Sequence, residues 1–238
     1  AQLAAYLAPR EPDASLMARR RTWLATGRAD IEPPRLDEGL TADFLSHTLG
    51  ELVGEDALVL DETITSSPSV RRHLMRTHPG TYFQSGGSSL GWHGGAAIGA
   101  KLAAPDRNVV ALTGDGSYLF SVPSSVHWVA RRYGTPFLTV IYNNRGWNAT
   151  KQNLLKLHPD GVAAKTDRLW VNLDNESDLP AMAVAAGAGF GATVSQAQDL
   201  ASTLLAAMDC VSSGRSAVVD VRLPAISKPV SYTHLTLP

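Results

Sequence analysis

The chain has 238 residues, a formal net charge of -1, an apolar content of 44% and one cysteine. Its length allows one α/β domain with a full hydrophobic core, or one domain and a piece of another. The balanced charge gives no support for a nucleic acid or a membrane surface as partner, and no apolar run approaches the roughly 18 residues of a membrane span. Cys210 has no disulfide partner; its helical setting predicts a small core residue, and we expect a cytoplasmic protein.

Residues 1–35 do not show the pattern of a domain. One helix is predicted over residues 15–26, followed by Gly27 and by a break at Pro33 and Pro34. The chain starts at Ala1 rather than Met, which also suggests a fragment of a longer protein. We therefore expect residues 1–35 to be the tail of a preceding domain and its linker.

From residue 36 onward, short apolar runs alternate with helical patterns. Six strands separated by helices predict an α/β fold, a doubly wound and mostly parallel six-stranded sheet with helices on both faces. We expect this domain to cover residues 36–228. Residues 229–238 continue no pattern, resemble translated adapter sequence and are treated as a non-native tail. The strands are predicted at 57–61, 81–84, 108–113, 136–142, 191–194 and 217–223, and the helices at 40–52 (capped by Thr41), 69–76, 92–104, 124–133, 179–188 and 196–213.

The central strand-helix-strand unit carries the most informative motif. Gly114, Asp115 and Gly116 follow its first strand, and Asn144 follows its second. In a right-handed unit these two turns lie side by side at the carboxyl ends of adjacent strands. Asp115 offers an anionic oxygen and Asn144 an amide oxygen, which suit Mg²⁺, and the glycines let the backbone approach a phosphate. Taken singly, the two residues are common as a helix cap and a turn former; together they predict a magnesium-bridged diphosphate.

The spacing of these turns resembles that of the thiamine-diphosphate enzymes. The likeness continues upstream through 79–84, 88–92 and 96–103 and covers about residues 36–224, close to the full extent of that family's diphosphate-binding domain. It is strongest to the branch that contains acetolactate synthase and benzoylformate decarboxylase. The resemblance implies thiamine diphosphate and Mg²⁺ as cofactors, and it makes residues 1–35 the end of the family's middle domain.

The resemblance also gives roles to single residues of the metal site and the substrate pocket. Asp115, Asn144 and a backbone oxygen of Gly146 would hold the metal. Ile64 and Ala149 would face the substrate.

Other residues would touch the cofactor itself. The Ser88 carbonyl would accept a hydrogen bond from the cofactor's amino group, Leu90 would wedge between its two rings, and Thr65 would bond a diphosphate oxygen. A Ser/Thr-rich turn that caps the next helix explains the stretch around Thr65 nearly as well. The residues implied to bind the cofactor are Thr65, Ser88, Leu90, Gly114, Asp115, Gly116, Ser117, Asn144, Gly146 and Trp147.

Three further features near this site are interpreted from pattern. The weakly patterned stretch 150–175 is expected to fold over the bound cofactor as a lid, because long connections are usually functional or mobile. Trp147 either covers the site or is a packed aromatic, and the sequence does not separate the two. His93, in the first turn of a helix, is interpreted as a surface or capping group.

The activity implied by the resemblance is decarboxylation of a 2-oxo acid, with carboligation of the acetolactate synthase kind slightly favoured. A benzoylformate decarboxylase-like activity, a 2-hydroxyacyl-CoA lyase and an oxalyl-CoA decarboxylase stay open. In the family a glutamate from a pyrimidine-binding domain, usually on a partner chain, completes the site, and no residue here matches its context. We therefore expect no catalytic residue in this chain, no activity from it alone, and a homodimer or homotetramer for the complete protein.

The sequence also allows two functions from other classes of protein. Residues 87–91 match the G-x-S-x-G elbow of serine hydrolases, with Ser89 as nucleophile and His158 or His234 as base. In a hydrolase the oxyanion loop precedes the elbow, which disfavours this alternative. The second is a non-catalytic diphosphate-binding module, against which the intact Asp115 and Asn144 argue.

Overall fold

The computed structural model describes residues 13–29, 31–87, 89–166, 168–173 and 177–225, and its contacts divide the chain into two units, 1–33 and 34–238. In the first unit, helix α2 (Ala14–Ala29) begins where the Asp13 carboxylate accepts hydrogen bonds from the backbone amides of Ser15 and Leu16, at 2.9 and 3.1 Å. Within these ranges no helix has the length and apolarity needed to cross a membrane. Ser88 and the predicted tail 229–238 lie outside the described residues.

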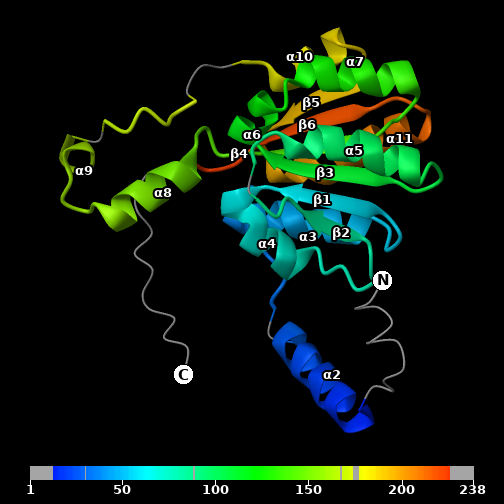
Figure 1. Ribbon diagram of the computed structural model, residues 1–238, viewed down its shortest axis with the longest axis horizontal. Helices are drawn as coiled ribbons and strands as arrows, with labels where there is room; N and C mark the ends of the chain where they lie inside the picture. The colour runs from blue at the N-terminus through cyan, green and yellow to red at the C-terminus, as the bar shows by residue number, and fades with distance from the viewer. Residues whose placement is uncertain (1–12, 30, 88, 167, 174–176, 226–238) are drawn as a thin grey trace, which may run out of the picture. The chain divides into compact units, whose positions relative to one another are not determined.

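The second unit is built on a six-stranded sheet in which every pairing is parallel, in the order β2-β1-β3-β4-β6-β5 (Figure 1). The residues of β1, β3, β4 and β6 are almost all buried, as expected for strands that helices cover on both faces. This confirms the predicted doubly wound α/β fold. The strands are β1 (Leu58–Glu62), β2 (Tyr82–Gln84), β3 (Val109–Gly114), β4 (Leu138–Asn143), β5 (Phe190–Val194) and β6 (Ala217–Arg222).

Alternate residues of the four central strands enter different cores because the side-chain period of a strand is two. Val59 and Val110 belong to one cluster, and their neighbours Leu60 and Ala111 belong to another. The first cluster packs under α3 (Ala42–Leu52), α4 (Ser67–His73) and α11 (Leu200–Ser212). The opposite face carries α5 (Trp92–Ala103), α7 (Pro123–Tyr133) and α10 (Leu179–Ala185), as Figure 1 shows.

The structure adds short helices that the sequence pattern did not reveal. Helix α6 (Asp115–Phe120) begins directly at the Gly-Asp-Gly turn and is separated from α7 by Val122, which adopts a left-handed conformation (φ 54°) before Pro123. The stretch predicted as weakly patterned contains α8 (Asn148–Leu157) and α9 (Val162–Thr166). Short 3-10 turns occur at η1 (Leu36–Glu38), η2 (Ile64–Ser66) and η3 (Ala197–Asp199).

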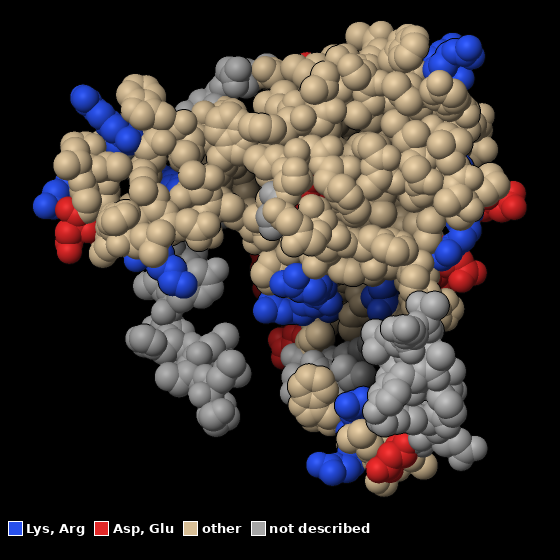
Figure 2. Space-filling model, viewed as in Figure 1, with Lys and Arg blue, Asp and Glu red and all other residues tan. Residues whose placement is uncertain are grey.

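Charged side chains are interspersed on the face of the molecule shown in Figure 2, and much of that face is uncharged.

The predicted Thr41 cap is confirmed, because its side chain accepts a hydrogen bond from the Phe44 amide at 3.1 Å. Cys210 is partly buried, packs against the first core cluster, and has its thiol pKa raised by burial. A raised pKa leaves less reactive thiolate, which fits the predicted packing role.

Candidate functional site

The carboxyl ends of β1, β3 and β4 meet at one edge of the sheet. Register pairs Glu62 of β1 with Thr113 of β3, and Gly114 of β3 with Tyr142 of β4, so the three following loops are neighbours. The helices after β1 and β3 leave to opposite faces, which makes this a topological switch point of the kind where α/β proteins bind ligands. A cavity of about 60 Å³ lies here.

Every predicted site residue that the structure describes lines this cavity. Those residues are Ile64, Thr65, Leu90, Gly114, Asp115, Gly116, Ser117, Asn144, Gly146, Trp147 and Ala149. The sequence did not single out three further lining residues, Thr63, Asn148 and Thr150. We call this space the site cavity.

Among the described residues that line the site cavity, Asp115 is the one carboxylate. It is the first residue of α6 and only 3% exposed, and its Oδ2 is buried without a hydrogen-bond partner among the described residues. Burial raises the pKa of Asp115 to about 6, and the backbone amides of Gly116 and Gly146 oppose this shift only in part. An under-solvated carboxylate of this kind is stabilised by a cation placed at its free oxygen.

Asn144 is held by hydrogen bonds from two directions. Its Nδ2 donates to the Thr65 hydroxyl at 3.2 Å, which links the loops after β4 and β1. Its Oδ1 accepts from Asn148 Nδ2 at 2.8 Å, and its backbone oxygen is 3.3 Å from the same nitrogen. The Thr65 bond fixes which way the amide points, and Oδ1 keeps a second lone pair beside the one that accepts from Asn148. Asn148, four residues after Asn144 and the first residue of α8, orients this amide and was not singled out from the sequence.

The loop after β1, residues 63–67, is fixed by a buried carboxylate. Asp61 Oδ1 accepts from the Thr63 amide and hydroxyl at 2.9 and 2.7 Å, and its Oδ2 accepts from Ser67 and Gln84 at 2.8 Å each. Ile64 is thereby held in a left-handed conformation, φ 51°, which is unusual for a β-branched residue and typical of functional loops. The alternative interpretation of this stretch as a simple helix cap is wrong, because Ser66, at the cap position of α4, makes no capping bond.

The turn that carries Leu90, residues 89–93, forms another wall; we call it the Leu90 turn. His93 at its end is 1% exposed, and its Nδ1 lies 2.8 Å from a carboxylate oxygen of Glu62. The interpretation of His93 as a surface group is therefore wrong. Its ring stacks on Tyr118 of α6 with centroids 6.2 Å apart, so it is a buried support of the site.

Trp147 lines the site cavity and is packed against its neighbours. A Cβ on Gly116 would lie 2.1 Å from Trp147 Nε1, which means that the indole rests directly on the glycine. The indole meets Phe120 edge to face with centroids 6.2 Å apart. Its buried Nε1 has no hydrogen-bond partner among the described residues, and a donor in that position is suited to an anion.

The donor set fits a magnesium ion that is bound mainly through phosphate. In the part of the chain that the structure describes, no group of three or more His, Cys, Asp or Glu residues could hold a metal by itself. Asp115 and Asn144 supply two oxygen atoms of the kinds that Mg²⁺ prefers, and Mg²⁺ usually completes its shell with phosphate oxygens and water. The free Asp115 oxygen, the unpaired indole N–H and the open glycine backbone are thus consistent with a metal-diphosphate group.

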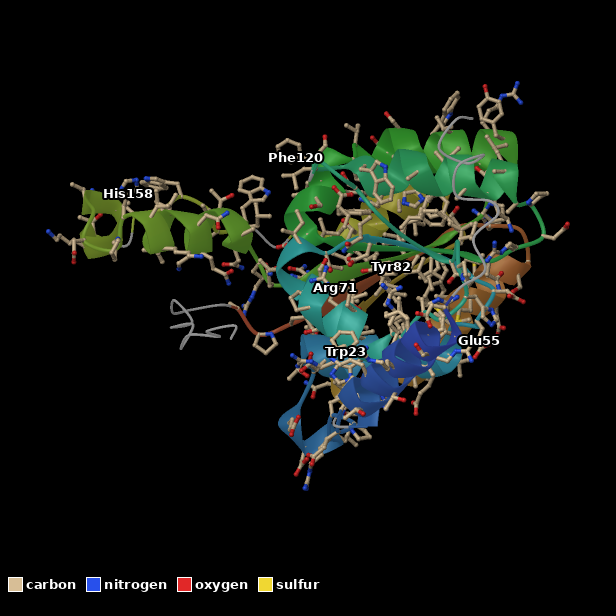
Figure 3. The ribbon with its side chains drawn as sticks, turned by 60° about the horizontal axis from the view of Figure 1, so that its bottom comes forward. Trp23, Glu55, Arg71, Tyr82, Phe120 and His158 are labelled. Carbon is tan, nitrogen blue, oxygen red and sulfur yellow. The ribbon has the colours of Figure 1, made fainter. Side chains whose placement is uncertain are left out.

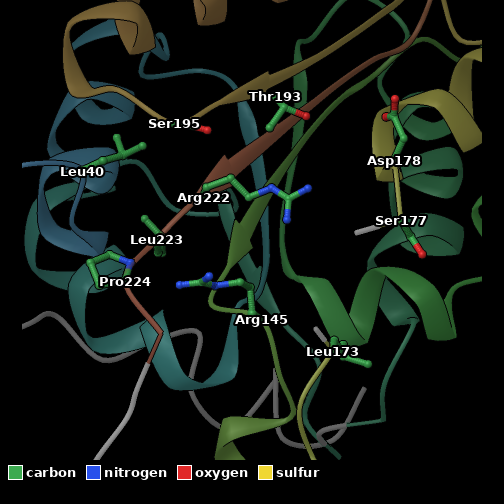
Figure 4. A pocket seen from close by; sticks show the side chains of 10 residues that line it. All are labelled: Leu40, Arg145, Leu173, Ser177, Asp178, Thr193, Ser195, Arg222, Leu223 and Pro224. Carbon is green, nitrogen blue, oxygen red and sulfur yellow. The ribbon is translucent and has the colours of Figure 1, made fainter. Parts of the chain in front are cut away.

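A larger cavity of about 790 Å³ lies at the ends of β4, β6 and β5 (Figure 4). Arg222 in its wall is 3.0 Å from the buried Asp220 carboxylate; the two atoms are poorly aligned for a hydrogen bond and interact as an ion pair. Asp178 at its margin accepts a hydrogen bond from the Ala181 amide at the start of α10. Arg145 is the other charged residue among those that line it. The cavity thus has room for a ligand, but two of its three charged lining residues already have partners. Its lining residues are Leu40, Arg145, Leu173, Ser177, Asp178, Thr193, Ser195, Arg222, Leu223 and Pro224.

Among the described residues of the predicted lid, 150–175, Thr150 alone lines the site cavity. The rest of α8 and α9 extend away from the sheet in Figure 1. His158 follows α8 at the end opposite Asn148 and Ala149, as Figure 3 shows, and no histidine is among the described residues that line the site cavity. The serine hydrolase alternative thus gains no support from the described residues, and closure of residues 150–175 over a cofactor stays a prediction.

Comparison with known proteins places the chain in a family. The family model "Thiamine pyrophosphate enzyme, C-terminal TPP binding domain" matches residues 64–221. Acetolactate synthase large subunit IlvG of Mycobacterium tuberculosis is 31% identical over 156 residues, 64% of this chain and 26% of that protein. Benzoylformate decarboxylase of Pseudomonas aeruginosa is 30% identical over 122 residues, 50% of this chain and 23% of that protein.

The fold of this chain is similar to that of a solved enzyme structure. A thiamine diphosphate-dependent 4-hydroxybenzoylformate decarboxylase of Rhodococcus jostii superposes with a TM-score of 0.70 at 24% identity. The superposition covers 83% of this chain and 35% of the other, and at this identity it speaks for the fold alone. The chain spans about a quarter of the length of the curated relatives named above.

Proposed function

The chain belongs to the thiamine pyrophosphate enzymes and contains their C-terminal TPP-binding domain, and from that premise we propose an activity for the protein of which it is part. We propose that this protein is a 2-oxo acid decarboxylase or carboligase of the acetolactate synthase kind, a lyase or transferase. Its cofactors are thiamine diphosphate and Mg²⁺, and the present chain supplies the diphosphate end of the site. A cytoplasmic location is proposed with it, on the ground of the single cysteine.

One observation carries the site assignment. The Asp115 carboxylate is buried, its pKa is raised to about 6, and its Oδ2 lacks a partner among the described residues in a cavity that Asn144 also lines. A buried carboxylate without a counter-charge costs stability, and such arrangements are typical of sites that act on a ligand. A divalent cation would remove this cost.

The residues of this chain would hold and orient the cofactor. Asp115 and the Asn144 amide would hold the metal, Gly146 would add a backbone oxygen, and Thr65 would donate to a diphosphate oxygen. Leu90 would set the bend between the two rings. When bound, thiamine diphosphate supplies the electron sink for decarboxylation, so the task of the protein is placement and exclusion of water.

The site is proposed to be incomplete in this chain alone. Ile64, 36% exposed, and Ala149 line the cavity and are proposed to face the substrate. The activating glutamate is proposed to come from a pyrimidine-binding domain of a partner chain, in a homodimer or homotetramer. The fragment is accordingly expected to bind the cofactor weakly and to have no activity by itself.

The identity of the substrate is proposed only at the level of a 2-oxo acid. The acetolactate synthase and benzoylformate decarboxylase relatives are about equally similar, so the likeness does not separate carboligation from simple decarboxylation. Product analysis of the full-length enzyme with pyruvate, benzoylformate and an acyl-CoA would decide among these and the CoA-dependent lyases. The appearance of a carboligation product from pyruvate supports the first choice.

Calorimetry on the 238-residue chain tests the cofactor assignment. The wild type should bind thiamine diphosphate only when Mg²⁺ is present, and Asp115→Ala should abolish this binding. Asp178→Ala, which removes a carboxylate at the margin of the larger cavity, serves as the matched control and should leave binding intact. Equal binding with and without Mg²⁺ would refute the proposal.

A further inference from the structure

A buried carboxylate behind the site cavity holds the whole Leu90 turn. Glu62 ends β1 and its side chain is 2% exposed. Its Oε1 accepts hydrogen bonds from the backbone amides of Gly91 and Trp92 at 2.6 and 3.3 Å. Its Oε2 accepts from the His93 amide at 2.8 Å and lies 2.8 Å from the ring Nδ1 of the same residue. These amides form the N-terminus of α5, where a negative charge is favoured.

The same turn is pressed against α6 on its other side. Gly91 adopts φ +88°, and a Cβ there would lie 2.8 Å from backbone atoms of Phe120 and Ser121. The turn is therefore clamped between the Glu62 carboxylate and the end of α6, the helix that begins at Asp115. Leu90, directly before the clamped glycine, has little freedom to move while both contacts hold.

We propose that Glu62 is a positioning residue that fixes Leu90 against the ring portion of the cofactor and has no part in holding the diphosphate. This inference rests on the proposed function. Its basis is that the described hydrogen bonds of the Glu62 side chain all go to the Leu90 turn. The groups assigned to the metal and diphosphate, Asp115 and Asn144, stand on the loops after β3 and β4.

The proposal predicts a loss of affinity that depends on which part of the cofactor is tested. In Glu62→Gln the side chain keeps its size but turns one acceptor into an NH₂ group that faces other N–H donors. The Leu90 turn should then shift, because a lost charge-assisted acceptor leaves backbone amides unsatisfied. A ligand with thiazolium and pyrimidine rings should bind less tightly, whereas the affinity for a ligand that consists only of a diphosphate should stay the same.

Calorimetry on the 238-residue chain with Mg²⁺ and two ligands, thiamine diphosphate and inorganic pyrophosphate, tests this. Glu62→Gln should raise the Kd for thiamine diphosphate about tenfold and change the Kd for pyrophosphate by less than about twofold. Leu90→Ala should reproduce the same split. Glu51→Gln, on the exposed surface of α3, is the matched control and should change neither value.

Each result has a distinct meaning. If Glu62→Gln weakens both ligands equally, or neither, the positioning role is refuted while the proposed function stands. If the wild type binds neither ligand, the proposed function fails and this inference fails with it. Should Glu62→Gln not fold, Glu62→Asp keeps the charge, shortens the reach and must show the same split at smaller size; an equal loss for both ligands again refutes the role.

Discussion

Two cavities lie at the same edge of the sheet, and the smaller one has the polar groups that a ligand could satisfy. The larger holds about 790 Å³, yet Arg222 in its wall pairs with Asp220 and Asp178 caps a helix. The site cavity holds about 60 Å³, and two buried polar atoms in its wall, Asp115 Oδ2 and Trp147 Nε1, have no hydrogen-bond partner among the described residues. Volume shows where there is room, whereas unsatisfied polar groups show where a ligand would lower the free energy.

The two cavities also differ in how their walls are built. The site cavity is walled by backbone in constrained conformations, with Ile64 at φ 51° and Gly91 at φ +88°. Arg145 in the wall of the larger cavity also has a positive φ (61°), but half of the residues that line this cavity are exposed, namely Arg145, Asp178, Thr193, Ser195 and Pro224. Substitutions should therefore have large effects around the site cavity and small effects around the larger one.

The largest effect is expected at Gly91. Gly91→Ala requires a left-handed alanine and brings its Cβ to 2.8 Å from the α6 backbone, so the free energy of unfolding should fall by about 4 kcal/mol. Gly80→Ala is the control, since Gly80 also has positive φ (+71°) but open space around it. It should cost only about 1–2 kcal/mol. Equal losses in chemical denaturation would show that the Leu90 turn is not tightly packed.

Asp115→Asn should stabilise the chain in the absence of ligand. The folded-state pKa of Asp115, about 6, lies above the ordinary 3.8, so the folded form binds its proton more tightly and loses stability as pH rises from about 4 to about 6. At pH 7 the variant should gain up to about 3 kcal/mol in free energy of unfolding and lose this pH dependence.

Asp178→Asn, in the wall of the larger cavity, is the control for that gain. Asparagine caps a helix about as well as aspartate, so the free energy of unfolding should change by less than about 0.5 kcal/mol. A destabilised Asp115→Asn at pH 7 would contradict the view that the wild-type carboxylate is under-solvated.

Gly116→Ala should reduce cofactor affinity more than stability. Its Cβ would meet the Trp147 indole at 2.1 Å, and the side chain can swing away at a cost of about 1 kcal/mol, but the methyl group would then stand where a phosphate approaches the backbone. The Kd for thiamine diphosphate with Mg²⁺ should rise at least about tenfold. Gly95→Ala on α5, with nothing within 4 Å, should leave the Kd unchanged.

The smallest effect is expected at Arg145, a charged side chain in the wall of the larger cavity. Arg145→Ala should change the Kd for thiamine diphosphate by less than about twofold, because its side chain lines the other cavity. A tenfold or greater loss of affinity for thiamine diphosphate would mean that the two cavities act as one site.

Local sequence patterns predicted the parts of the molecule that depend on local chemistry. The β-branched runs of β3 and β4 and the turns that hold Asp115 and Asn144 are of this kind, because a parallel unit brings those turns together wherever it forms. The same holds for the cap at Thr41. Short helix ends such as those of α4 differ from expectation by two or three residues.

Contacts between distant segments were not predictable in this way. Glu62 and His93 are 31 residues apart. Nothing in the residue types predicts that the Glu62 carboxylate caps the helix in which His93 lies. Asn148 supports Asn144 only because α8 starts where it does, in a stretch with weak helical periodicity. A carboxylate at the end of a buried strand is the signal that could have identified Glu62, since such a group must find donors inside the fold.

A double-mutant cycle between Asp115 and Asn144 tests the central claim most directly. Magnesium-dependent binding of thiamine diphosphate would be measured for the wild type, Asp115→Ala, Asn144→Ala and the double variant. If the two residues share one ion, each single variant loses the metal-dependent binding and the double variant is no worse than the more affected single one. Losses that add independently would show that the two side chains do not grip the same cation.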